Sequence, residues 1–283
     1  DRIMSSILSS AIDADKMDYL ERDSAHLGIP YGQSFDANRL IGALTLNEAQ
    51  DAIAIQAKGK ISAEMFIFSR YMMFSEAYWH HTVRAASAMV EAALADHVLR
   101  HDPDPADLTT RLLSSSDDEM LDWVRAEAPE ESVAGRLLTG MTKNSRRLYK
   151  RLATYSRVYS EETKKAAYEC LYAMDSEGLT HAAQRIAAAL SQLCGRPVYE
   201  GDVLIDTPPR DKDHPDTVDL RYTGVRGQQS YPLHELSGVV AGVHQDFVQV
   251  VKKIRVFVTP ELAAIAREQQ HVVEERLLEA ILA

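Results

Sequence analysis

The sequence has few cysteines, no long apolar run and no excess of positive charge. Its two cysteines, Cys170 and Cys194, lack paired spacing, so neither a disulfide framework nor a zinc motif is supported, and we expect both to be buried as small hydrophobic residues. A run of about 18 apolar residues, as a transmembrane helix needs, is absent. The first ten residues also lack the basic and apolar regions of a signal peptide. We therefore expect a soluble, cytoplasmic protein with no membrane partner.

The charge balance restricts the kind of ligand. The 283 residues are 46% hydrophobic and 26% charged, which is ordinary globular composition, and the formal net charge is −11. Such an acidic chain argues against a general nucleic-acid surface, because neutralising many phosphates requires a basic face. A small polyphosphate needs only a few cations focused within a cleft, so a nucleotide remains compatible with this composition.

One row of polar residues near the N-terminus could bind a ligand. Asp15, Tyr19 and Asp23 recur every four residues, so on a helix they share one face, with Lys16 and Arg22 beside them. Such a row can hold a metal ion through one carboxylate, bind a sugar hydroxyl through the phenol and the other acid, and meet a phosphate with the lysine. Periodic acids and bases are also typical of the solvated side of a surface helix, and spacing alone does not decide between the two interpretations.

The segment that carries this row reads IDADKMDYLERDSAHLG. It resembles the HD-domain phosphohydrolases, in particular the SAM and HD domain-containing deoxynucleoside triphosphate triphosphohydrolases and their bacterial relatives. The resemblance implies that Asp15 is a metal ligand, with Asp13 in reserve, that Lys16 contacts a phosphate, and that Tyr19 and Asp23 contact the sugar. It also implies a bound divalent metal ion, for which Mn, Fe, Zn, Ni and Mg all remain open.

The remaining metal ligands of that family are an upstream histidine and a consecutive His-Asp pair. The only His-Asp pair in this sequence is His101-Asp102, and the prolines at 103 and 105 favour a turn there over a rigid helix. We therefore expect this chain to be the C-terminal part of a larger enzyme.

A second set of residues lies on a predicted helix from Ser62 to Arg100. Arg70, Phe74 and Tyr78 recur every four residues and share a face. A guanidinium is well suited to clamp a phosphate, although a surface arginine beside two core aromatics would give the same pattern. The run SRYMMFSEAYWHH resembles the same family, and this implies that Arg70 contacts the terminal phosphate and that Tyr78 lines the sugar and base pocket.

Phe74 departs from the family pattern, which has a histidine at this position, next to the scissile phosphate. Phenylalanine neither donates nor accepts a proton, so general acid catalysis at this position is in doubt. His80 and His81 are near in sequence, but their spacing from Phe74 does not bring them to the same place.

The whole chain is predicted to be mainly α, an HD-domain helical fold, with a short β-hairpin and a small C-terminal α+β lobe. Residues 1–158 are expected to be the C-terminal part of an HD phosphohydrolase domain, and residues 159–283 the lobe. The predicted elements are a helix over 1–29, a hairpin over 39–55, the helix over 62–100, a helix with a Ser/Asp cap that continues through Trp123, a cationic helix with Arg146, Arg147, Lys150 and Arg151, an Ala-rich helix over 160–193, short strands beyond 197, and a strand, a turn at Thr259-Pro260 and a final helix.

The leading hypothesis for function is a metal-dependent phosphohydrolase of nucleotides, in the first place one that splits a dNTP into deoxynucleoside and triphosphate. The resemblance also implies a homo-oligomer. The alternative is a regulatory or nucleotide-binding protein that keeps the HD scaffold without an intact metal site. A third, weaker hypothesis is a single-stranded nucleic-acid binder that uses the basic segment 143–151, whose binding would fall steeply with salt.

Overall fold

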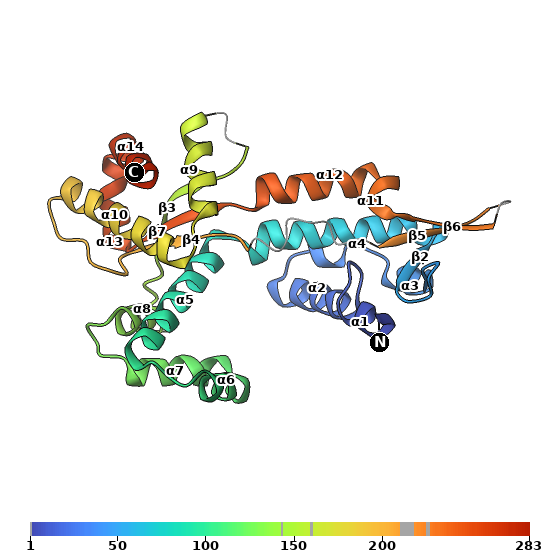
Figure 1. The fold of residues 1–283 in the computed structure, drawn as a ribbon, viewed down its shortest axis with the longest axis horizontal. Coiled ribbons are helices and arrows are strands. Elements are labelled where there is room, and N and C mark those ends of the chain that lie inside the picture. Colours follow the sequence, from blue (N-terminus) through green and yellow to red (C-terminus); the bar gives the residue numbers. More distant parts are fainter. Residues whose placement is uncertain (1, 143, 159–160, 210–217, 225–226) are drawn as a thin grey trace. The chain divides into compact units, whose positions relative to one another are not determined.

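In the computed structural model of the chain, residues 2–142, 144–158, 161–209, 218–224 and 227–283 are described, and most of their helices and strands are labelled in Figure 1. Helices dominate and two small sheets accompany them, which confirms the predicted mainly α fold. The chain forms two compact units, each built from two stretches of sequence. Unit 1 comprises Asp1–His80 and Pro209–Lys252, and unit 2 comprises His81–Pro208 and Lys253–Ala283.

Unit 1 contains short helices around one longer helix, α4, and a four-stranded sheet. Its elements are α1 (Arg2–Leu8), α2 (Ala14–Leu27), α3 (Ala37–Ile41), β1 (Leu44–Leu46), β2 (Ile53–Gln56), α4 (Lys60–Met73), β5 (Asp219–Gly224), β6 (Gly227–Pro232), α11 (Leu233–Leu236), α12 (Gly238–Asp246), two 3-10 turns (Tyr31–Gln33 and Ala57–Gly59) and two π-helical turns (Phe74–Tyr78 and Phe247–Val251).

The sheet of unit 1 has the strand order β1-β2-β5-β6. The predicted hairpin is confirmed, because β1 pairs antiparallel with β2, and the side-chain oxygen of Asn47 accepts hydrogen bonds from the backbone of Asp51 and Ala52 in the turn. β5 then joins β2 in parallel, and β6 returns antiparallel to β5. The sheet therefore unites strands from the two sequence stretches of unit 1.

Helix α4 is the centre of packing in unit 1. It contacts α2, α3 and α12, and Figure 1 shows α12 running alongside it. The apolar core around it draws on both sequence stretches and includes Ile12, Leu20, Leu40, Ile55, Phe66, Met73, Leu220 and Leu233. Residues on α2 and α4 that face each other are thereby fixed by a shared core.

The prediction of one continuous helix over 1–29 is wrong, because the structure has two helices there, α1 and α2. The side chain of Asp13 caps the second helix and accepts the backbone N–H of Lys16, and a capping aspartate of this kind starts a new helix. The predicted end is confirmed: Gly28 has φ +67, a left-handed conformation that glycine adopts without steric cost, and closes α2.

The predicted helix over 62–100 is also interrupted. α4 ends at Met73, the π-helical turn Phe74–Tyr78 follows, and α5 begins only at His81. A π turn inserts an extra residue into the helical repeat, which a count of 3.6 residues per turn does not anticipate. The break at Trp79 and His80 is also where unit 1 gives way to unit 2.

Unit 2 is a set of helices around a three-stranded sheet. Its elements are α5 (His81–His101), α6 (Pro105–Ser114), α7 (Asp117–Glu127), α8 (Val133–Met141), β3 (Lys150–Tyr155), α9 (Glu162–Ala173), α10 (Ser176–Cys194), β4 (Val203–Asp206), β7 (Ile254–Val258), α13 (Pro260–Glu268) and α14 (Gln270–Leu282).

The central strand β7 organises unit 2. The strand order is β3-β7-β4, and every residue of β7 is buried. Beside it, Arg84 on α5 forms an ion pair with the buried Asp206, and Arg255 lies 3.8 Å from the same carboxylate. Because β7 pairs with β3, the predicted division at 158/159 falls inside unit 2 rather than between the two units.

Three further predictions in unit 2 can be compared with the structure. The cationic helix is wrong, because α8 ends at Met141 and Lys150 already begins β3. The Ala-rich helix over 160–193 divides into α9 and α10, since Asp175 caps a new helix. The Ser/Asp cap is confirmed as a reciprocal pair of Ser116 and Glu119 at the start of α7.

The cysteines are half-buried rather than fully buried, and both pack against the apolar core of unit 2. None of the described helices is both long and apolar enough to cross a membrane.

Gly32 provides a test of packing in unit 1. A Cβ atom at this position would meet the carbonyl oxygen of Leu20 at 2.0 Å, so we expect Gly32→Ala to lower the free energy of unfolding by about 1–3 kcal/mol. The matched control is Gly242→Ala on α12, where a Cβ meets nothing within 4 Å and helix propensity predicts a gain of about 0.5–1 kcal/mol. Urea unfolding of both variants measures the difference, and equal stabilities would contradict the close approach.

Candidate functional site

The first wall of the candidate site is α2, which carries the predicted row of polar residues. Asp15 lies in its first turn with an exposed side chain, Tyr19 and Asp23 follow at one-turn intervals, and both of these are half-buried. The ammonium of Lys16 donates to the carboxylate of Asp13 at 2.6 Å and is largely shielded from solvent. The row is therefore not simply the solvated side of a surface helix, because only its first acid is fully exposed.

Asp13 and Asp15 differ sharply in their surroundings. The carboxylate of Asp13 is buried and accepts three hydrogen bonds, from the backbone of Ser10 and Lys16 and from the Lys16 ammonium. For Asp15, no hydrogen bond is found within the part of the chain that the structure describes. Asp15 is thus the one whose oxygens are available to a ligand, whereas Asp13 serves the start of α2.

The second wall comes from the end of α4 and the π-helical turn that follows it. The guanidinium carbon of Arg70 lies 5.6 Å from the ring centroid of Phe74, and the rings of Phe74 and Tyr78 meet edge to face at 5.2 Å. The predicted common face of Arg70, Phe74 and Tyr78 is therefore present despite the interrupted helix.

The two walls meet through their aromatic and acidic side chains. The hydroxyl of Tyr78 donates to the carboxylate of Asp23 at 2.8 Å, and the rings of Tyr19 and Tyr78 lie edge to face at 5.9 Å. The Arg70 guanidinium lies close enough to the phenol of Tyr19 to lower its pKa. The structure thus joins Tyr19, Asp23, Arg70 and Tyr78 in one cluster, while Lys16 is turned toward Asp13.

Both phenols in this cluster stay protonated at neutral pH. Burial raises the pKa of Tyr78, and the carboxylate of Asp23 raises it further because it accepts the phenolic proton. Burial also raises the pKa of Tyr19, although the Arg70 guanidinium acts in the opposite direction. The hydroxyl of Tyr19 can therefore donate a hydrogen bond to an acceptor on a ligand, whereas the proton of the Tyr78 hydroxyl is already donated to Asp23.

An aromatic cluster supports the second wall, and sequence reasoning missed one of its members. Phe247, in the π-helical turn after α12, lies 5.6 Å from Phe74 and 5.4 Å from Trp79 between ring centroids. Nothing in the local pattern distinguishes Phe247 from an ordinary core residue, since its partners belong to the other sequence stretch of unit 1.

Asp15 can offer a metal ion only one carboxylate. Among the described residues, a search for three clustered His, Cys, Asp or Glu side chains finds only His97, His101 and Glu127, which belong to unit 2. The pair His101-Asp102 does not form a helical ligand pair, because α5 ends at His101 and Asp102 has φ +43. The expected turn at this point is confirmed.

Comparison with known proteins shows the family. The model of the family described as "HD associated region" matches residues 35–274, which is most of the chain. The chain belongs to the HD-associated region family. Among curated proteins, this HD-associated chain is 34% identical over 152 residues to the uncharacterised protein MJ1154 of Methanocaldococcus jannaschii, and 38% identical over 97 residues to YwfO of Bacillus subtilis. It is also 36% identical over 82 residues to L394 of Acanthamoeba polyphaga mimivirus, a protein named as HD domain-containing.

These matches cover limited shares of the proteins compared. They take in 53%, 34% and 29% of this chain and 31%, 22% and 17% of the relatives, so the chain spans less than a third of the length of each. Two solved structures share the fold at 20% identity. A phosphohydrolase from Bacteroides thetaiotaomicron has a TM-score of 0.58 over 91% of this chain and 63% of its own, and a hypothetical protein from Aquifex aeolicus has a TM-score of 0.53 over 94% and 59%.

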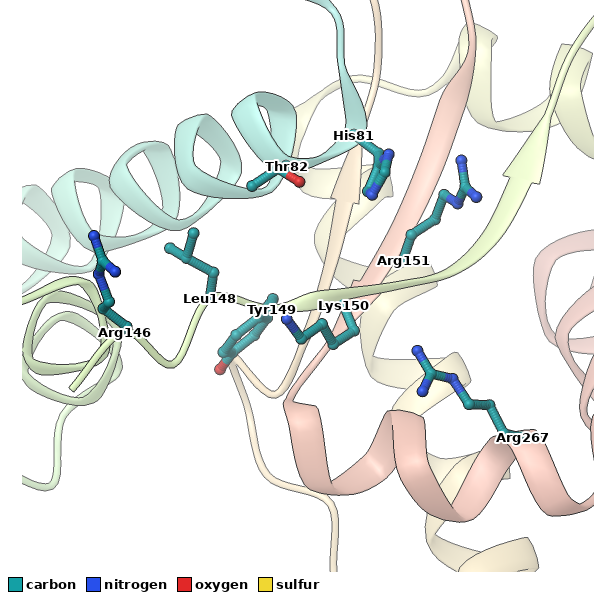
Figure 2. Close-up of a pocket in the computed structure, with 8 residues that line it drawn as sticks. All are labelled: His81, Thr82, Arg146, Leu148, Tyr149, Lys150, Arg151 and Arg267. Atoms are coloured by element: carbon teal, nitrogen blue, oxygen red, sulfur yellow. The ribbon is translucent and has the colours of Figure 1, made fainter.

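A basic pocket lies in unit 2 of the HD-associated chain. Its volume is about 470 Å³, and Figure 2 shows the side chains that line it: His81, Thr82, Arg146, Leu148, Tyr149, Lys150, Arg151 and Arg267. The basic residues predicted on one helix are instead divided between a loop, where Arg146 has φ +45, and strand β3. Four cations and a histidine around one cavity give an otherwise acidic chain a local concentration of positive charge, which favours anions.

The contrast between Asp13 and Asp15 yields a prediction about stability. Asp13→Ala removes a helix cap and leaves the half-buried Lys16 ammonium without its carboxylate partner, so we expect the free energy of unfolding to fall by about 1–3 kcal/mol. Asp15→Ala removes only a favourable charge from the first turn of α2 and should cost less than about 1 kcal/mol. Urea denaturation of both variants measures this, and the opposite order would show that the two carboxylates have exchanged roles.

Proposed function

We propose that the chain is part of an HD-type, metal-dependent phosphohydrolase that acts on deoxynucleoside triphosphates and releases triphosphate. The observation that carries the proposal is the cluster of Tyr19, Asp23, Arg70 and Tyr78, in which residues from two helices form one surface of phenol, carboxylate and guanidinium groups. These groups suit the parts of a nucleotide: a guanidinium for phosphate, a carboxylate and phenols for sugar hydroxyls.

Asp15 fits the role of a metal ligand. Its carboxylate is exposed in the first turn of α2, whereas Asp13 is fully engaged by Lys16 and by the backbone. A divalent ion bound at Asp15 would act as a Lewis acid and would lower the pKa of a bound water molecule. The ion needs further ligands besides Asp15, and the family's histidine and His-Asp pair would provide them.

Lys16 and Arg70 are the proposed phosphate contacts. Arg70 is held by Tyr19 and by the face of Phe74, which orients its planar fork. The ion pair with Asp13 orders the Lys16 side chain, so the lysine would place one positive charge near the phosphates in a fixed position. The fixed cations would stabilise negative charge that develops on the leaving triphosphate.

Tyr19, Asp23 and Tyr78 are the proposed nucleoside contacts. Tyr78 donates to one oxygen of Asp23, which leaves the other oxygen to accept a hydrogen bond from a sugar hydroxyl. The edge-to-face packing of the two tyrosines brings bulk against the sugar, which would disfavour an additional 2′-hydroxyl. The deoxy preference is taken from the family resemblance.

A homo-oligomer in the cytoplasm is part of the same proposal, and the basic pocket suits a regulatory nucleotide. The pocket also favours a second candidate function, a nucleotide-binding regulatory protein that keeps the scaffold without an intact metal site. Metal content distinguishes the two: the enzyme should hold about one tightly bound divalent ion at Asp15, lost in Asp15→Ala, and the regulatory protein should hold none there. The name phosphohydrolase, carried by the Bacteroides protein of the same fold, supports the enzyme.

The experiment that tests the function is triphosphate release by the full-length protein that contains this chain. We expect release from dNTPs, much less from NTPs and none from nucleoside diphosphates, and we expect Asp15→Ala to abolish it. No release from any nucleotide in the presence of Mn²⁺, Fe²⁺, Ni²⁺, Zn²⁺ or Mg²⁺ would contradict the proposal.

Arg70→Lys tests the phosphate contact. The substitution keeps the charge and loses the planar fork, and a charge-assisted hydrogen bond contributes about 1.5–3 kcal/mol, so kcat/KM should fall roughly tenfold to a hundredfold. The matched control is Arg125→Lys on α7, an exposed arginine that pairs with the exposed Asp122, which should leave kcat/KM unchanged. Wild-type kinetics in Arg70→Lys would show that Arg70 is a packing residue.

Phe74→His restores the residue that the family has at this position. Since Phe74 packs against three aromatic rings, we expect the histidine to lower the free energy of unfolding by about 1–3 kcal/mol and to lower triphosphate release. The control is Phe68→His, a half-buried aromatic on α4 outside this cluster, which should lower stability without the loss of activity. Increased release in Phe74→His would indicate that a proton donor is missing from the natural site.

A further inference from the structure

Two histidines and a glutamate, which are side chains of the kinds that bind metal ions, lie close together on two neighbouring helices of unit 2. His97 and His101 are one turn apart near the end of α5, and Glu127 is the last residue of α7. One ligand atom from each lies within 4.8 Å of the other two. Two histidines four residues apart on a helix face the same side, which is the spacing by which helices chelate zinc.

His97 has an unusual environment for a histidine. It is only 2% exposed, its Nδ1 has no hydrogen-bond partner among the described residues, and its Nε2 lies 3.7 Å from Oε2 of Glu127, which is beyond hydrogen-bond distance. A buried polar ring without partners is costly, and a metal ion would engage one of its nitrogens.

The surroundings hold the carboxylate in position. Trp123 Nε1 donates to Oε1 of Glu127 at 2.7 Å, which leaves Oε2 directed to His97, and the indole ring packs edge to face on His97 at 4.5 Å. A hydrogen bond of this kind to a metal-binding carboxylate is typical of metal sites. The positive charge of Arg111 disfavours a metal ion here, although its guanidinium is stacked on Trp123, 4.1 Å from the ring centroid. The carboxylates of Glu127 and Asp96 act in the opposite direction, because they supply negative charge.

We propose that His97, His101 and Glu127 bind a divalent transition metal ion of the zinc type. Two imidazole nitrogens and one carboxylate oxygen form a ligand set that such ions prefer, with a water molecule as the fourth ligand. The ion would join the end of α5 to the end of α7. None of these residues belongs to the cluster around Asp15, so the proposal stands or falls separately from the proposed hydrolase.

The test is metal binding by the metal-free 283-residue chain in the Asp15→Ala background, which removes the ligand predicted in unit 1. Zn²⁺ is titrated by calorimetry and Co²⁺ by visible absorption. We expect one equivalent to bind, and we expect His101→Ala and Glu127→Gln to weaken binding by at least about tenfold. Both altered side chains are exposed, so folding should persist, and circular dichroism checks it.

The matched control is His181→Ala, an exposed histidine on α10, which should bind Zn²⁺ and Co²⁺ as the unaltered background does. Zn²⁺ should also raise the midpoint of thermal unfolding of the background and of His181→Ala, and not of His101→Ala. Absence of binding overturns the proposal, and so does a Co²⁺ spectrum or Zn²⁺ affinity that His101→Ala leaves unchanged.

Discussion

The hydrogen bond from Tyr78 to Asp23 is the interaction on which the candidate site depends. It ties the π-helical turn after α4 to the third turn of α2, and it fixes the positions of Tyr19 and Arg70, which contact each other beside it. The bond is charge-assisted and partly shielded from water, which makes it stronger than an exposed one. Without it, the shared apolar core would have to hold this end of α4 and its π-helical turn against α2.

The π-helical turn gives this interaction its geometry. An uninterrupted α-helix would carry Tyr78 onward with α5, whereas the extra residue in the turn ends the helix and leaves Trp79 buried against Phe247. Such turns are often found at functional sites. In this chain the turn also coincides with the passage from unit 1 to unit 2, so the residues of the cluster all belong to unit 1.

Local sequence signals predicted much of this arrangement. The row on α2, the face shared by Arg70, Phe74 and Tyr78, the hairpin of β1 and β2 and the glycine cap at Gly28 all follow from spacing or turn chemistry, and the structure contains them. What spacing does not encode is which acid is engaged. Asp13 and Asp15 are two residues apart and chemically identical. They differ in their contacts: the Asp13 carboxylate caps α2 and binds the Lys16 ammonium, whereas the Asp15 carboxylate is exposed.

Tertiary pairing explains the errors. The basic residues from 146 to 151 were predicted on a helix because their spacing allows it, but β7, more than a hundred residues later in the sequence, draws Lys150 and Arg151 into a sheet. Phe247 joins Phe74 from the other stretch of unit 1 for the same reason. Propensity and periodicity are local, and these contacts are not.

The central claim is that α2 and the π-helical turn form one nucleotide-binding surface. Hydrogen–deuterium exchange of the full-length protein, with and without a non-hydrolysable dNTP, tests it most directly. The account predicts slower exchange in peptides that cover 13–27 and 66–80 when the nucleotide is bound. Unchanged exchange in both of these peptides, with protection only near 146–151, would contradict it.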